Sequence, residues 1–116
     1  MKKNYKMDSF DAFNDGIAIV TREKTKKIDF SKASSKEKDR EEICRLRFAF
    51  MSNRVEDTEF IESFGRTLST KIKTRLYDHK INDCIVLIGK DTYSIVYIDI
   101  DKKKKEMYLY MEQAEV

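Results

Sequence analysis

Apolar and polar residues alternate along much of the chain, and this alternation predicts β-strands. The clearest pattern covers residues 67–76. Its inner positions are Leu68, Thr70, Ile72, Thr74 and Leu76, and its outer positions are Thr67, Ser69, Lys71, Lys73 and Arg75. The segment therefore predicts a long strand whose outer face is basic.

Shorter segments of the same kind predict the remaining strands. They cover residues 16–23, 44–51, 84–88, 93–100 and 107–112. For the second of these, a helix through Ile43, Leu46 and Phe50 is a competing interpretation. The run 84–88 is continuously apolar, which predicts a strand that is buried on both faces or that closes a barrel.

Two short polar segments predict hairpin turns between the last three strands. They are Gly89–Asp91 and Asp101–Lys105. In the strand between them, strict alternation places Tyr93, Ile95 and Tyr97 on one face, opposite Ser94, Val96, Ile98 and Ile100.

One short helix is expected over residues 56–64. Phe60, Ile61 and Phe64 recur at helical spacing, and we expect them to form its apolar side. The first turn is acidic, which suits the positive end of the helix dipole. Gly65 follows where a left-handed residue would end the helix.

A long charged loop is expected between the first two strands. Residues 31–42 contain a single small apolar residue, Ala33, and no aromatic residue. A loop of this length in a compact domain is either functional or disordered, and a short exposed helix capped by Ser35 is a further alternative. We therefore divide the chain into a flexible tail, residues 1–13, and one β-barrel domain, residues 14–116, with a loop at 29–42.

Together these elements predict a mainly β fold. We expect a small antiparallel β-barrel or sandwich of five to six strands, with one short helix and one long charged loop. The chain has 116 residues, which is enough for one domain with a modest core.

Composition narrows the class of protein. Charged residues make up 39% of the chain, yet the net charge is only +3, well short of a strongly basic DNA binder. No apolar run is long enough to span a membrane, and the first residues lack the apolar run of a signal peptide. Two cysteines, Cys44 and Cys84, cannot form a disulfide framework, and we expect both to be small buried apolar residues.

The sequence offers no catalytic constellation. His79 is the only histidine, and we expect it in an exposed turn, without a nucleophile that it could activate. Asp99 and Asp101 lie near a turn, where nothing would desolvate them and shift their pKa. The three glycines stand apart, so no phosphate-binding loop is formed. We therefore expect no enzymatic activity, cofactor, metal site or small-molecule substrate.

Basic residues are the remaining candidates for a binding site. If the two central strands are neighbours, one basic face collects Arg45, Arg47, Lys71, Lys73 and Arg75. Tyrosines beside it (Tyr93, Tyr97, Tyr108 and Tyr110) would then suit a small-barrel module for single-stranded nucleic acid. The plainer interpretation is that any solvent-facing sheet surface must be polar. Likewise, the run Lys102–Lys105 is either a solvated tip or a phosphate contact.

Over roughly residues 14–112, the chain resembles the head–tail adaptor family of tailed phages, whose members are also called head closure, head completion or stopper proteins. The resemblance rests on residues 59–77 followed by 84–111. It consists of a short helix, a basic alternating strand, a Gly turn with an aromatic residue soon after (Gly89, Tyr93), and a charged turn after Asp101. Strands 17–22 and 44–51 are similar to the family's first two strands, although the usual Trp of the second strand is absent.

The resemblance implies a structural component of the virion at the head–tail interface, present in the host cytoplasm during assembly. Such a protein would form a ring of its own copies between a portal-proximal connector protein and a tail or tail-completion protein. It would help to retain packaged DNA, without contact with a membrane. The loop at 29–42 would face the channel, and Lys32, Lys36, Lys38 and Arg40 are its candidate contacts to DNA.

Overall fold

The computed structural model describes residues 13–23 and 40–114. These residues form six strands and one helix in the order β1 (Gly16–Glu23), β2 (Arg40–Met51), α2 (Val55–Glu62), β3 (Thr70–Arg75), β4 (Ile85–Ile88), β5 (Asp91–Asp101) and β6 (Glu106–Gln113). The mainly β fold with one short helix is confirmed.

All strand pairs are antiparallel, and the sheet closes on itself. The strands follow the order β1-β2-β3-β6-β5-β4, and β4 returns to pair with β1 through Ile19↔Leu87, Val20↔Val86 and Thr21↔Ile85. The apolar run at 84–88 therefore closes the barrel, as one of the two interpretations of that run expected. Closure removes the free edges on which a β-rich chain would aggregate.

The barrel interior holds the main core. Its buried residues come from every strand and from the β3–β4 connection, and they include Ala18, Val20, Phe48, Ile72, Ile81, Cys84, Val86, Ile95, Met107, Leu109 and Met111. On β6 the inward residues Met107, Leu109 and Met111 recur at every second position, as strand geometry requires. On β1 the inward residues are Ala18 and Val20, so the face shared by Ile17 and Ile19 points outward.

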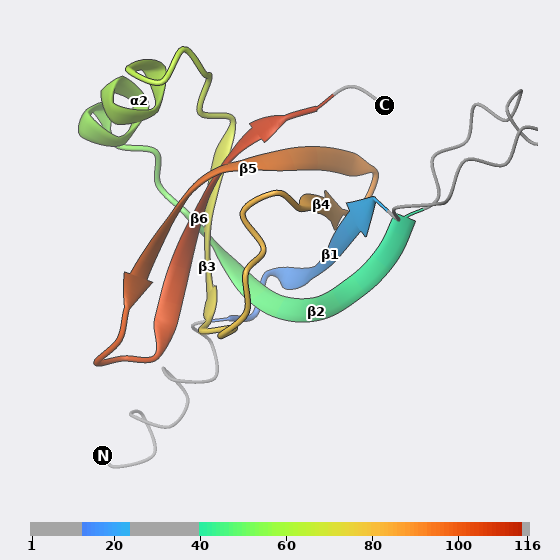
Figure 1. Cartoon of the computed structure of the whole chain (residues 1–116). Helices are drawn as coiled ribbons and strands as arrows, with labels where there is room; N and C mark the ends of the chain where they lie inside the picture. The colour runs from blue at the N-terminus through green and yellow to red at the C-terminus, as the bar shows by residue number, and fades with distance from the viewer. Residues whose placement is uncertain (1–12, 24–39, 115–116) are drawn as a thin grey trace, which may run out of the picture.

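Helix α2 lies against the outside of the barrel, over the region where β5 and β6 pair (Figure 1). Ile61 is fully buried there in a second, smaller cluster with Leu68 and Tyr110. The helix ends at Glu62, two residues earlier than expected, and the chain continues through a turn to Gly65, whose φ is 74°. Only a residue tolerant of positive φ, above all glycine, fits that position without strain.

Several boundaries differ from the sequence-based expectations. Strand β2 begins at Arg40 and pairs with β1 as far as Glu23↔Arg40, so residues 40–42 belong to a strand and not to the predicted loop. This pairing also excludes a helix that continues through Glu42. The folded domain includes Phe13, which is buried, so the predicted tail is at least one residue shorter. The rest of the predicted tail and residues 29–39 lie outside the described residues.

The interior position of Phe48 makes it the first test of the fold. Phe48→Ala should lower the free energy of unfolding by about 3–5 kcal/mol, because it removes a large buried ring and leaves a cavity. Phe50 lies two residues along the same strand and is the matched control, since it is 51% exposed where Phe48 is 1% exposed. Phe50→Ala should cost about 1 kcal/mol or less. Urea denaturation measures both, and equal losses would contradict the assignment of the core.

Candidate functional site

The most developed polar site of the described residues is a buried ion pair between α2 and β3. Lys71 leaves β3 toward the outside of the barrel, where α2 covers it, and its Nζ donates to Asp57 Oδ2 at 3.1 Å. Each of the two side chains is only 8% exposed. The expectation that Lys71 belongs to an open basic face is therefore wrong, because the helix packs over that part of the strand.

Two tyrosines and an arginine complete the surroundings of the pair. The Lys71 ammonium lies 4.9 Å from the ring centroid of Tyr110 and 5.4 Å from that of Tyr108, within reach of cation–π attraction. The Tyr110 hydroxyl donates to Asp57 Oδ1 at 3.5 Å, and Arg54 Nε donates to Asp57 Oδ2 at 3.3 Å. Asp57 also accepts the backbone N–H of Arg54, so the same carboxylate caps the start of α2.

The electrostatics keep this site ionised. Burial opposes the charge on Asp57, but hydrogen bonds from Arg54 and Lys71 outweigh it, so the pKa of Asp57 falls below its ordinary value. Burial raises the pKa of Tyr110, although Lys71 opposes that change. At neutral pH the carboxylate therefore stays charged and fully engaged. An arrangement of this kind fixes a helix in place and is poorly suited to proton transfer.

A hollow of about 400 Å³ lies beside the ion pair. It is lined by Met51, Ser52, Arg54, Lys71, Asp99, Tyr108 and Tyr110. The ammonium at its wall is already neutralised by Asp57, so the hollow offers no buried cation for an anionic ligand.

An exposed aromatic cluster lies next to the ion pair. The ring centroid of Phe60 is 4.8 Å from that of Tyr97 and 4.9 Å from that of Phe64. Phe60, Phe64 and Tyr97 are 40%, 50% and 37% exposed, so only Ile61 of the predicted apolar side of the helix is buried. The eight-residue helix buries one stripe, Asp57 and Ile61. Phe60 lies beside that stripe, and Phe64 lies in the turn that follows the helix.

The rest of the predicted basic face is divided. Strands β2 and β3 are neighbours, as that prediction required, with Ala49↔Lys73 and Met51↔Lys71. However, Phe13 lies over the outer face of β3, with its ring centroid 5.5 Å from Lys73 Nζ and 5.1 Å from Arg75 Cζ.

Two arginines of the predicted face lie on β2. Arg45 is exposed and forms a two-pronged hydrogen bond with Glu42, through Nε at 2.9 Å and Nη2 at 3.1 Å. Arg47 is exposed on the same strand. No single open surface therefore gathers the five predicted residues.

Of the four residues predicted to face the channel, the structure describes Arg40. Lys32, Lys36 and Lys38 lie outside the described residues. Arg40 is the first residue of β2 and pairs with Glu23, so it belongs to the barrel wall and not to a loop. The β1–β2 pairing continues past a register shift between Val20 and Thr21 as far as Glu23↔Arg40.

The tyrosines also separate. Tyr93 packs against the barrel core, Tyr110 is buried under α2, and Tyr97 is exposed at the surface. The cause on β5 is a bulge between Ile95 and Tyr97, where two residues oppose Tyr110. Strict alternation, which placed Tyr97 on the face of Ile95, therefore fails there.

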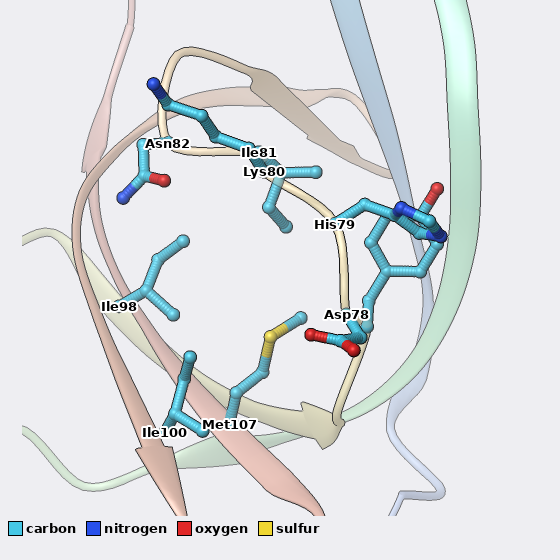
Figure 2. A pocket seen from close by; sticks show the side chains of 9 residues that line it. Asp78, His79, Lys80, Ile81, Asn82, Ile98, Ile100 and Met107 are labelled. Carbon is cyan, nitrogen blue, oxygen red and sulfur yellow. The ribbon is translucent and has the colours of Figure 1, made fainter.

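A second hollow, of about 330 Å³, lies near His79 (Figure 2). Ile98, Ile100 and Met107 line it across from Asp78 and His79, as Figure 2 shows. His79 is exposed, as expected, and its ring lies 4.9 Å from that of Tyr77. The hollow therefore has an apolar wall and a polar rim.

We also looked in the part of the chain that the structure describes for reactive thiols, metal-binding clusters and membrane-spanning helices. Cys84 is buried and Cys44 is half-buried, and burial raises the pKa of both thiols. Residues 13–23 and 40–114 contain no cluster of three or more His, Cys, Asp or Glu side chains that could hold a metal ion. They also contain no helix with the length and apolar character needed to cross a bilayer.

No family model matches the sequence, and no curated protein matches it.

The ion pair predicts an asymmetric response to mutation. Asp57→Ala should lower the free energy of unfolding by about 3–5 kcal/mol, because it leaves the Lys71 ammonium buried without a counter-ion. Glu59→Ala, at an exposed position of the same helix, should change it by about 0.5 kcal/mol or less. The double variant Asp57→Leu/Lys71→Met removes both charges and should recover most of the loss. Urea denaturation measures all three, and equal effects of the two single variants would contradict the ion pair.

The lowered pKa of Asp57 predicts a dependence of stability on pH. Between its folded pKa and its unfolded value of about 3.9, the unfolded chain binds more protons at this site, so acidification favours unfolding. The stabilising contribution of Asp57 is complete at neutral pH and is lost as pH falls through the folded pKa. The stability difference between wild type and Asp57→Asn should therefore narrow on acidification. Thermal unfolding across that range checks this, and a constant difference would contradict it.

Proposed function

We propose that this protein is a structural component of a phage head–tail connector, acting as a ring subunit that joins head to tail and helps to retain packaged DNA. The observation that carries the proposal is the closed six-stranded barrel with a long insertion between β1 and β2. Strands β1 and β2 stay paired as far as Glu23↔Arg40. The chain therefore leaves the barrel at Glu23 and re-enters it at the adjacent residue Arg40.

The geometry suits a mechanical role. A closed barrel is a rigid body whose outer wall is available for protein contacts, while an insertion at one end can act without disturbing the strands. The insertion carries Lys32, Lys36 and Lys38, whose charges complement phosphate. In this proposal the insertions of a ring face the central channel and the barrel walls contact neighbouring proteins.

A nucleic-acid-binding module is the second candidate, and two observations weaken its support. Lys71 is occupied by Asp57, and Phe13 lies over Lys73 and Arg75. The tyrosines expected to stack bases are distributed between the barrel core, the contact with α2 and the surface. The remaining support for this candidate is the basic character of Arg45 and Arg47 on β2.

Deletion of the gene from the source phage or prophage tests the proposal. Electron microscopy should show tailless heads that have lost their DNA, and a plasmid copy of the intact gene should restore complete particles. Normal, DNA-filled, tailed particles would contradict the connector role. Salt-dependent binding of single strands by the purified protein would then favour the second candidate.

The role of the insertion needs its own variants in the complemented strain. A gene lacking residues 31–39 keeps Arg40 and the whole of β2, so the barrel should still fold. We expect joined particles that retain less DNA. Reversal of Lys32, Lys36 and Lys38 to Glu should act in the same direction, while reversal of Lys102, Lys103 and Lys104, exposed in the β5–β6 turn, is the matched control for charge. Full DNA retention in both insertion variants would refute the role of the insertion.

A further inference from the structure

The exposed aromatic cluster on α2 has the properties of a docking surface. We call Phe60, Phe64 and Tyr97 the α2 patch. Glu56, Glu59 and Glu62 flank it on the helix, and residues 55–64 contain no Lys or Arg. Three clustered aromatic rings with acidic neighbours fit a partner surface that is apolar and basic.

The β-bulge on β5 builds this patch. Without the extra residue, Tyr97 would face the barrel interior along with Ile95. The bulge turns Tyr97 outward, where it pairs with Tyr110 and meets Phe60. A local departure from regular pairing thus brings a third aromatic ring to the surface, although burying that ring would have stabilised the isolated domain.

The opposite wall of the same barrel is apolar and basic. We call its outward residues the β1 face: Ile17, Ile19, Leu87, Arg45 and Arg47. They form adjacent rows, because Ile17 pairs with Arg47 while Ile19 pairs with Arg45 on one side and with Leu87 on the other. Ile17 is 50% exposed and both arginines are exposed, and Arg45 also holds its two-pronged contact with Glu42.

The two surfaces lie on opposite sides of the molecule. In the closed strand order, β6 and β1 are three places apart in either direction. Figure 1 shows α2 over β5 and β6 on one side, and β1 on the other side beside β2 and β4. One copy can therefore present its α2 patch to a second copy while its own β1 face stays open.

We propose that the α2 patch of one copy docks on the β1 face of the next copy, so that the protein assembles head to tail. This inference rests on the proposed function and specifies the contact between subunits of its ring. The aromatic rings lie on Ile17, Ile19 and Leu87, and the helix carboxylates meet the two arginines. A contact between two different faces is heterologous, and it gives a ring when the rotation between copies closes.

Photo-cross-linking of concentrated purified protein tests which surfaces meet. With p-benzoylphenylalanine in place of Phe64, we expect a cross-link to a peptide of another copy that contains residues 17–19 or 45–47. The same group in place of Lys103, in the β5–β6 turn, is the control and should give no such product. A cross-link from one α2 to another α2, or no product between copies, would overturn the proposal.

Mixing two variants tests the heterologous geometry. Phe64→Asp damages the α2 patch and Arg47→Glu damages the β1 face, and each alone should weaken self-association by at least about tenfold. Each variant keeps one intact surface, so the mixture should form a one-to-one dimer that cannot grow. Val55→Asp, exposed on the same helix, is the matched control and should associate like wild type.

Sedimentation equilibrium measures these states, and thermal unfolding confirms that the exposed substitutions leave the barrel folded. A mixture that behaves like the separate variants would overturn the heterologous contact. The two proposals fail in different ways. Normal particles after gene deletion would remove the connector role but leave the cross-link unchanged. If deletion of the gene abolishes complete particles but no cross-link forms between copies, the connector role stands and the proposed contact is wrong.

Discussion

The buried contact between Lys71 and Asp57 fixes the outer surface of this protein. It joins α2 to β3 and caps the start of the helix, and it also orders Tyr110 beneath the helix. Ion pairs of this kind add little net stability, since desolvation offsets much of the attraction. This ion pair instead fixes the position of α2 on the barrel. In that position Ile61 packs in the small outer cluster, and Phe60 faces solvent beside Tyr97.

Alternation alone predicted most of the barrel. The strand limits at 16–23 were correct, and the apolar run at 84–88 indicated how the sheet closes. Sequence reasoning failed where tertiary contacts override local pattern. The pattern predicts that Lys71 faces solvent, but α2 covers it in the structure. The pattern also places Tyr97 on the same face as Ile95, but a bulge turns Tyr97 to the opposite face. Neither the packing of the helix on the barrel nor the position of the bulge can be predicted from hydrophobic periodicity.

The candidate surfaces were harder to predict than the fold. Five basic residues matched one face of two adjacent strands. In the structure Lys71 is in a buried pair, Lys73 and Arg75 lie beside the Phe13 ring, and Arg45 and Arg47 are exposed on β2. The α2 patch escaped notice because helical spacing groups Phe60 and Phe64 with Ile61. A short helix on a curved wall buries only one stripe of side chains. The glutamates at positions 56, 59 and 62 were the sequence signal that the rest of this helix faces solvent.

In the proposed function, a rigid barrel with two opposite, complementary walls serves as a ring subunit at the head–tail junction. Cryo-electron microscopy of the intact particle tests it most directly. We expect a ring of this barrel below the portal, with α2 of each copy against β1 of its neighbour and the insertion after Glu23 directed to the channel. A junction without this protein, or a ring in which α2 faces away from every neighbouring copy, would contradict it.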